Sequence, residues 1–397
     1  MNAARMKGAW LAAFFLLCAA CPAQAEDRGR QGAYLVVLGD CAACHTPPGG
    51  AAFSGGKRIP TPFGAVIAPN LTPDRETGLG GWSDDEFARA LRLGRRRDGS
   101  FLYPAHPYPY FVRFTLAEAS AIRAYLATLP PVHQPVRGAD LPFPLDLRFL
   151  LLFWDALYAT PAPPLPDPDH DALWNRGAFI VTGPGHCGAC HTAKTLLGGD
   201  VAARALQGGV VAGWVAPALD GDRRTGLGDW SEAEIARFLA TGSAHGQLAS
   251  GPMAEVVEMS GARMSEADRT AIAHYLKSLP APPPAPSPQP PAAAMAAGEG
   301  LYRLRCAPCH GANGKGTPGL FPRLAGSAIV QAAKPETILR VIRAGARAAA
   351  TEAAPTGAAM PAFAARLHDA EIAAIATYIR NSWGNAAPAV SARDVTP

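Results

Sequence analysis

The chain has 397 residues, of which 49% are hydrophobic and 17% are charged, a composition typical of a globular protein and not of a disordered one. Its length is enough for about two to four domains. The 36 Lys and Arg residues nearly balance the 32 Asp and Glu residues, so the charge does not support nucleic-acid binding.

Residues 1–25 have the pattern of a secretory signal peptide. Two basic residues precede a short apolar run, and the small-residue cleavage site Ala23-Gln-Ala25 follows it. The apolar run is too short to span a bilayer comfortably, and a retained membrane anchor is the alternative interpretation. Cleavage would remove Cys18 and Cys21, and loss of the two basic residues would lower the net charge from +4 to +2. The pattern therefore predicts an exported protein.

Six of the eight cysteines lie in three copies of the pentapeptide Cys-x-x-Cys-His. The copies are Cys41-Ala-Ala-Cys44-His45, Cys187-Gly-Ala-Cys190-His191 and Cys306-Ala-Pro-Cys309-His310. This motif attaches c-type haem, because its two thiols add to the porphyrin vinyl groups and its His binds the iron as proximal ligand. A zinc site or a redox-active dithiol is the alternative for a single Cys pair, but neither explains the following His. We predict three covalently bound haem c groups.

The sequence around the motifs repeats as well. A Gly followed shortly by an aromatic residue precedes each motif, in Gly32-Ala-Tyr34, Gly177-Ala-Phe179 and Gly300-Leu-Tyr302. Each repeat closes on a segment with apolar residues three and four positions apart, which is the pattern of an amphipathic helix. The patterns predict helices over Leu116 to Leu129, Glu266 to Leu279 and Asp369 to Trp383.

The repeats predict an all-α fold of three cytochrome c-like domains in tandem, joined by proline-rich linkers. We expect the domains at 28–131, 170–280 and 294–385, and call them modules one, two and three. The expected linkers are residues 132–169 and 281–293, and residues 386–397 form a C-terminal tail. Beyond residues 1–25, no apolar run approaches membrane-spanning length. The apolar segment Phe143 to Tyr158 either packs against a module or contacts a partner subunit or a membrane surface.

A cytochrome module also needs a distal iron ligand, usually Met or His. Met253 follows His191 by 62 residues, and Met360 follows His310 by 50 residues. No Met lies between Met6 and Met253, so module one cannot use Met.

The distal candidate of module one is His106. It follows His45 by 61 residues, close to the spacing of Met253 in module two. The alternatives are a surface-loop His with five-coordinate iron, or His133, which lies beyond the closing helix. The ligand set predicted for the three irons is His45, His106, His191, Met253, His310 and Met360.

A proximal His must donate its other ring N–H to an acceptor. A Pro-x-Leu triplet lies between the proximal and distal candidates of every module, at Pro69, Pro217 and Pro322. We expect the proline carbonyl to accept this hydrogen bond, although a loop turn packed on the haem edge is an equal alternative.

Several strings resemble the triheme cytochrome c subunits of membrane-associated periplasmic dehydrogenases. The resemblance extends from Gly32 to about Trp383. It rests on strings such as Thr61-Pro-Phe-Gly64, Asn70-Leu-Thr-Pro73, Thr77-Gly-Leu-Gly80, Leu102-Tyr-Pro-Ala105, Trp174-Asn-Arg-Gly177, Gly251-Pro-Met-Ala-Glu255 and His274-Tyr-Leu-Lys-Ser-Leu-Pro280. The chain departs from the family at His106, where the family usually has Met. It also has no long C-terminal tail after Trp383, which leaves the mode of membrane attachment open.

The resemblance implies an electron-transfer subunit that serves a catalytic subunit oxidising an alcohol, sugar or aldehyde. Electrons would pass to ubiquinone or a terminal oxidase, from a peripheral position on the periplasmic face of the membrane. Two other functions stay open: a free periplasmic electron shuttle, and a haem peroxidase with an open iron position in module one. No nucleotide-binding fingerprint, nucleophile elbow or metal-hydrolase helix motif occurs in the sequence.

Overall fold

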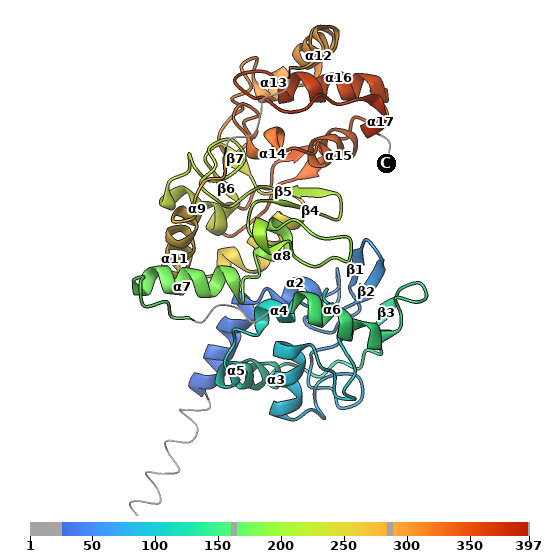
Figure 1. Ribbon diagram of the computed structural model, residues 1–397, viewed down its shortest axis with the longest axis vertical. Helices are drawn as coiled ribbons and strands as arrows, with labels where there is room; N and C mark the ends of the chain where they lie inside the picture. The colour runs from blue at the N-terminus through green and yellow to red at the C-terminus, as the bar shows by residue number, and fades with distance from the viewer. Residues whose placement is uncertain (1–25, 160–164, 284–288, 396–397) are drawn as a thin grey trace, which may run out of the picture. The chain divides into compact units, whose positions relative to one another are not determined.

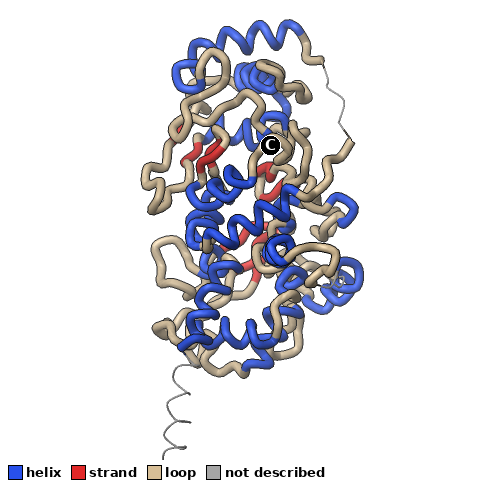
Figure 2. The backbone as a smooth tube through the Cα atoms, turned by 90° about the vertical axis from the view of Figure 1, so that its left-hand side faces the viewer, coloured by secondary structure: helices blue, strands red, loops and turns tan. Residues whose placement is uncertain are grey.

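The computed structural model describes residues 26–159, 165–283 and 289–395, and the regular secondary structure of this part of the chain is mainly helical, with long loops between the helices (Figures 1 and 2). It divides into two compact units, one of residues 26–59 and 63–151 and the other of residues 60–62 and 152–395. The expected signal peptide, residues 1–25, lies outside the described residues. So do residues 160–164 and 284–288 of the expected linkers. The first unit contains the first motif, and the second unit contains the other two.

The first unit begins with helical residues 26–38, which lead into the first motif. Its other helices are α2 (Cys41–His45), α3 (Asp84–Leu93), α4 (Tyr108–Phe111), α5 (Leu116–Leu126) and the short 3-10 helix η1 (Arg148–Leu150). The strands of its sheet are β1 (Arg58–Thr61), whose last two residues are grouped with the second unit, β2 (Gly64–Ile67) and β3 (Ala139–Asp140), in the order β1-β2-β3. Strands β2 and β3 are antiparallel, with Val66 opposite Ala139.

The second unit begins with α6 (Leu151–Tyr158), apart from the first residue of this helix. The helices of module two are α7 (Ala172–Thr182), α8 (Gly188–His191), η2 (Ala202–Arg204), α9 (Glu232–Thr241), α10 (Pro252–Met259), η3 (Gly261–Arg263) and α11 (Glu266–Lys277). Its antiparallel hairpins are β4 (Gly209–Val211) with β5 (Trp214–Ala216), and β6 (Ser243–Ala244) with β7 (Gln247–Leu248).

The remaining elements belong to module three and the tail. The helices are α12 (Ala292–Arg305), α13 (Ala307–His310), α14 (Ala328–Gln331), α15 (Glu336–Ala344), α16 (Asp369–Arg380) and α17 (Ala392–Val395). Strands β8 (Ala346–Arg347) and β9 (Ala359–Met360) form an antiparallel pair. The buried core of this module is formed mainly by α15 and α16, and it includes Ile342, Ile372 and Ile375.

The closing helices α5, α11 and α16 begin where the sequence predicts and end two or three residues earlier. Their starts are fixed by caps, since Thr115 and Ser265 accept hydrogen bonds from backbone N–H groups of the first turn and His368 forms a capping box with Glu371. In the first two modules the helix stops ahead of a proline, and the residue before a proline avoids the helical conformation. The short strands are an addition to the expected all-α fold.

A glycine allows the first helix of each module to cross the closing helix at close range. A Cβ at Gly32, Gly177 or Gly298 would collide with a carbonyl oxygen of α5, α11 or α16, at Ala121, Ala271 and Ala374 respectively. The same glycines face the Cβ atoms of Tyr125, Tyr275 and Tyr378. In module three the glycine at this helix crossing is Gly298. Gly300 does not take part in the crossing, because a Cβ at Gly300 would have no atom within 4 Å.

Gly298→Ala and Gly300→Ala should change stability in opposite directions, although both lie in α12. Gly298→Ala should destabilise the protein by about 1–3 kcal/mol, because the added methyl pushes α16 away. Gly300→Ala should stabilise it by up to about 1 kcal/mol, because Ala is the better helix former. Urea unfolding of both variants measures the difference. A neutral Gly298→Ala variant would contradict the close crossing.

The segment between modules one and two contacts module two at two aromatic side chains. Trp154 Nε1 donates to the carbonyl of Leu197 at 3.0 Å, and Tyr158 packs over Gly199. Three other large side chains of α6 are exposed: Leu152 (54%), Phe153 (62%) and Leu157 (61%). The segment therefore packs in part against module two and leaves an apolar side of α6 in contact with solvent.

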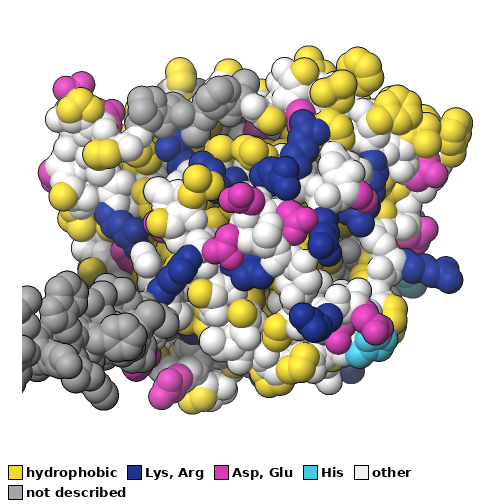
Figure 3. Space-filling model, turned by 90° about the horizontal axis from the view of Figure 1, so that it is seen from below, with side chains coloured by type: hydrophobic (Ala, Val, Ile, Leu, Met, Phe, Trp, Pro, Cys, Tyr) yellow, Lys and Arg dark blue, Asp and Glu magenta, His cyan; other side chains and the backbone are white. Residues whose placement is uncertain are grey.

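Charges are mixed on the protein surface. Figure 3 shows basic and acidic side chains interspersed on one face, and ion pairs such as Arg97–Glu86 and Arg123–Asp84 are examples in the first unit. Among the described residues, none of the helices combines the length and the hydrophobicity needed to cross a bilayer.

Candidate haem-attachment sites

Each Cys-x-x-Cys-His motif lies at a short helix that follows the first helix of its module. The motif histidines are the last residues of these short helices, His45 in α2, His191 in α8 and His310 in α13. The backbone after His45 repeats after His191, since the carbonyls of both accept from a glycine N–H, at Gly55 and Gly208. The sequence repeat thus corresponds to a repeated local structure.

The motif histidines make the hydrogen bond expected from the sequence. In all three, Nδ1 lies within hydrogen-bond distance of a proline carbonyl oxygen: 2.8 Å from His45 to Pro69, 2.7 Å from His191 to Pro217 and 3.0 Å from His310 to Pro322. A carbonyl oxygen can only accept, so Nδ1 carries the proton. The prediction of proline carbonyls as acceptors is therefore confirmed in every module.

This hydrogen bond leaves Nε2 with a lone pair, as an iron ligand requires. The structure gives Nε2 of these three rings no hydrogen bond to a described residue. Burial lowers the pKa of His45, His191 and His310 below the ordinary value, which favours the neutral ring. The three imidazoles have the tautomer and charge state of proximal haem ligands.

Cys41, Cys187 and Cys306, the first cysteine of each motif, lie in surroundings that disfavour the thiolate. Burial raises the pKa of Cys41 and Cys187 to about 12 and that of Cys306 to about 11, so these sulfurs resist ionisation. Zinc binding and thiol exchange both use the thiolate. The described residues also contain no cluster of three or more His, Cys, Asp or Glu side chains that could hold a metal ion. Uncharged thioethers fit this environment.

Two residues that the sequence analysis did not single out shape the proximal loops. Thr46 and Thr192 directly follow the motif histidines, and their hydroxyls accept from the N–H groups of Phe53 and Leu206. Phe53 and Leu206 both have a φ of 59°, a left-handed conformation that is uncommon outside Gly. The sequence signal that could have identified Thr46 and Thr192 is the dipeptide His-Thr, whose His ends the motif in both module one and module two.

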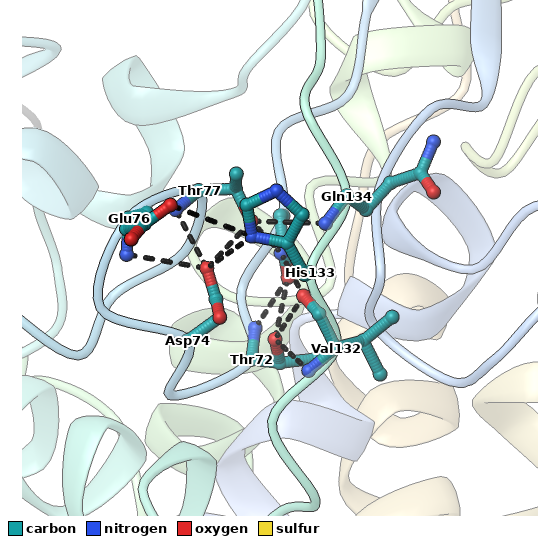
Figure 4. Close-up of polar contacts among 8 residues, drawn as sticks. Thr72, Asp74, Glu76, Thr77, Val132, His133 and Gln134 are labelled. Carbon is teal, nitrogen blue, oxygen red and sulfur yellow. Dashed lines mark hydrogen bonds and ion pairs between the residues drawn. The ribbon is translucent and has the colours of Figure 1, made fainter.

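In module one, the acceptor loop is tied to the segment after the closing helix. Asn70 follows Pro69, and its side-chain amide donates to the Val132 carbonyl at 2.7 Å. Figure 4 shows the neighbouring contacts, in which the Val132 N–H donates to Thr72 Oγ1 and the Gln134 N–H donates to Thr77 Oγ1. These bonds fix the position of the Pro69 carbonyl and therefore the orientation of the His45 ring.

His133 belongs to this same surface network. Its Nδ1 lies 3.6 Å from Asp74 and 3.8 Å from Glu76, and its side chain is 58% exposed (Figure 4). A half-exposed ring paired with carboxylates in a surface loop is not placed as a buried iron ligand would be. The structure thus favours His106 over His133 as the distal candidate of module one.

His106 and Met253 occupy equivalent positions in their modules. Helices α3 and α9 both end at a glycine with positive φ, Gly94 and Gly242, and the carbonyl of each accepts from the N–H of a residue in the following loop. These residues are Leu102 in module one and Ala249 in module two. His106 and Met253 both lie four residues further on. The structural alignment agrees with the sequence spacing.

The His106 ring is half-buried and packs edge-on against Phe111 at 5.4 Å between centroids. Phe111 in turn lies 3.9 Å from a Cβ placed on Gly39, two residues before Cys41. The distal segment therefore packs against the start of the attachment motif. Nε2 of His106 lies 3.3 Å from the Leu91 carbonyl oxygen, to which it donates a hydrogen bond.

Met360 lies in β9, opposite Ala346 of β8. Cys306 of the attachment motif, Leu324 of the acceptor loop and Met360 are partly buried side chains that pack against the same core cluster. Module three thus brings its proximal motif, its acceptor loop and its distal candidate to one core. Met253 packs against a separate cluster that contains Ala249, Ala254 and Val257.

Comparison with known proteins agrees with these sites. The cytochrome c family matches residues 176–280 and 295–383, which include the second and third motifs. The cytochrome c subunit of the quinone-dependent alcohol dehydrogenase of Gluconacetobacter polyoxogenes is 40% identical over 97% of this chain and 88% of its own length. The chain belongs to the family of dehydrogenase cytochrome c subunits. As a member it functions in electron transfer, and haem c is its cofactor.

Other members of the dehydrogenase cytochrome c subunits are nearly as similar. The gluconate 2-dehydrogenase cytochrome c subunit of Pantoea cypripedii is 37% identical over 92% of this chain and 88% of its own length. The fructose dehydrogenase cytochrome subunit of Gluconobacter japonicus is 34% identical over 91% of this chain and 80% of its own length. The family therefore serves dehydrogenases with different substrates, and membership alone does not fix the substrate.

Proposed function

We propose that this chain holds three haem c groups and passes electrons from the catalytic subunit of a periplasmic dehydrogenase to a membrane quinone or a terminal oxidase. The observation that carries the proposal is the triple repeat of a motif histidine whose Nδ1 donates to a proline carbonyl. When bound, each haem supplies an iron that alternates between ferric and ferrous states. Three such groups in one chain provide successive positions for a single electron.

The residues of the chain have distinct tasks in this proposal. The cysteine pairs 41 and 44, 187 and 190, and 306 and 309 attach the haems. His45, His191 and His310 are the proximal ligands, each oriented by its proline carbonyl. His106, Met253 and Met360 are the distal ligands, and they set the relative potentials because thioether sulfur favours ferrous iron more than imidazole does.

The proposed organisation is three cytochrome c domains in tandem, with proline-rich linkers between them. The repeated glycine crossing of the first and closing helices supports three domains, because it occurs once around every motif. The linkers begin after closing helices that stop ahead of a proline in modules one and two.

The proposed partners are a catalytic dehydrogenase subunit and the periplasmic face of the membrane. The relatives are named as cytochrome subunits of alcohol, gluconate and fructose dehydrogenases, which supports an oxidoreductase partner that oxidises alcohols, sugars or related compounds. The exposed Leu152, Phe153 and Leu157 of α6 supply an apolar side for peripheral attachment.

The chain should sediment with membranes, and a larger dehydrogenase subunit should co-purify with it after mild detergent extraction. Phe153→Glu should lower membrane binding by about tenfold or more, because it removes a large apolar group and adds a charge at the bilayer surface. Leu304→Glu is a matched control, since Leu304 is 66% exposed on α12, far along the chain from α6. Haem content and membrane sedimentation are measured for both variants.

The result also separates the other two functions. A wild-type chain found entirely as a soluble monomer at physiological salt would favour a free electron shuttle. Rapid turnover of hydrogen peroxide by the isolated chain would favour a peroxidase with an open iron position in module one.

A further inference from the structure

Modules two and three share an extensive contact inside the second unit, although a proline-rich segment joins them in sequence. Val215 N–H of β5 donates to Thr337 Oγ1 of α15 at 2.6 Å, and the Arg340 guanidinium lies 5.4 Å from the Trp214 ring. The N–H of Arg323 donates to the Gly246 carbonyl at 2.8 Å. These bonds involve the backbone of both modules, so the two modules are not independent bodies joined only by a linker.

The contact continues to the segments that carry the two methionines. Residues 346–349 of module three pair on one side with β9, since Ala346 lies opposite Met360. Their other neighbour is module two, because Ala348 forms an antiparallel bridge with Ser250 and the Ala349 N–H donates to the Ala249 carbonyl at 2.9 Å. Residues 346–349 are thus hydrogen-bonded to the strand that contains Met360 and to the loop that precedes α10, the helix in which Met253 is the second residue.

Ala349 also belongs to the packing around Met253. It is 5% exposed and forms one buried cluster with Ala249, Ala254 and Val257 of module two, against which Met253 packs. A Cβ built on Gly242 would lie 2.8 Å from the Ala349 Cβ, so the two backbones are in close contact. The Ala350 N–H donates to Glu258 Oε1 at 2.7 Å and so fastens the segment to α10, the helix that begins beside Met253.

In module one, a segment of the same unit supports the equivalent position. The residue that corresponds to Ser250 is Tyr103, which follows Leu102 as Ser250 follows Ala249. The Tyr103 hydroxyl donates to the Asp146 carbonyl at 3.1 Å, and Arg148 lies over its ring at 4.3 Å. A segment of the same unit therefore holds the loop of His106, whereas the loop of Met253 has a small Ser and is bridged to module three.

We propose that residues 346–349 of module three position Met253 of module two, so that both methionine ligands depend on one shared ladder. The inference rests on the proposed role of Met253 and Met360 as distal ligands. Residues 346–349 are positioning residues, since they act through the methionines. A substitution at residues 346–349 of module three should therefore change the ligand field and the midpoint potential of the haem in module two.

Ala349→Leu tests the proposal. The closely packed cluster has no room for the larger side chain, so the loop of Met253 should move away from its position. The oxidised holoprotein should lose one of two Met-to-ferric-iron charge-transfer signals in the near infrared, and one midpoint potential should fall. Ala353→Leu makes the same change at an exposed position of the same loop and should leave both signals and all potentials unchanged.

Met253→Ala and Met360→Ala identify which signal belongs to which haem. The proposal predicts that Ala349→Leu removes the signal that Met253→Ala removes. It is overturned if Ala349→Leu keeps both signals or loses only the one that Met360→Ala removes. If Met253→Ala itself changes no signal and no potential, the ligand assignment in the proposed function is wrong, which is a separate outcome.

Glu258→Ala provides the test if Ala349→Leu yields no holoprotein. Glu258 is partly exposed, so its loss removes the hydrogen bond to Ala350 without opening the buried cluster. Exogenous imidazole should then displace the methionine of one haem about tenfold more readily, which corresponds to the loss of one charge-assisted hydrogen bond. Glu352→Ala, at an exposed position of the same loop, is the control, and equal imidazole affinities in the two variants would overturn the proposal.

Discussion

Replacing both cysteines of one Cys-x-x-Cys-His motif with Ala should remove one haem mass from a protein that otherwise carries three. The thioether bonds are covalent, so acid-acetone extraction should leave all three haems on the wild-type chain. Intact-mass spectrometry of the mature protein measures the number directly. A wild-type mass with two haems would contradict the proposed function of one of the three motifs.

The three double variants should differ in their effect on the remaining haems. Loss of the haem at Cys41 and Cys44 should leave the spectra of the other two unchanged, because module one lies in its own compact unit. Loss of the haem at Cys306 and Cys309 should weaken the methionine signal of module two, because residues 346–349 support both methionine segments. If the modules were independent, each double variant would lose only the spectral signal of its own haem, and the three losses would be additive.

The parts of the site that depend on local sequence were predictable. The acceptor carbonyls of Pro69, Pro217 and Pro322 were expected because the Pro-x-Leu triplet repeats between the proximal and distal candidates, and all three hydrogen bonds are present. The starts of the closing helices were predictable because a capping residue and an acidic first turn precede a periodic apolar pattern. Their ends were less well defined, because in modules one and two the nearest stop signal is a proline three or four residues beyond the last helical residue.

The parts that depend on tertiary contact were not predictable. Gly298 and Gly300 are equally plausible in the sequence, and only the crossing with α16 shows that Gly298 is the one in contact. The ladder between modules two and three joins Ala348 to Ser250 through backbone atoms, and alanines in a loop carry no pattern that indicates a partner. The proline-rich segment suggested separation, since linker composition describes the linker and not the surfaces that it connects.

Replacing His106 with Met should raise one of the three midpoint potentials and leave the other two nearly unchanged. A second imidazole is a stronger donor than a thioether and favours ferric iron, so the haem of module one should have the lowest potential of the three. A low potential suits this haem to accept electrons first and pass them to the two haems with methionine ligands. Redox titration with near-infrared spectra should show a third methionine signal in the His106→Met variant.

Two matched variants make the His106 experiment decisive. Met253→His at the equivalent position of module two should do the reverse, lowering one potential and removing one methionine signal, because the two residues lie four positions after equivalent hydrogen-bonded residues. His133→Met exchanges the same residue types in the surface network of Asp74 and Glu76, and it should change neither potentials nor spectra. Three methionine signals in the wild type, or unchanged potentials in His106→Met, would show that His106 does not bind iron. In that case a substitution of His106 would act through the packing contacts of the ring, such as those with Phe111 and Leu91, and not through the iron.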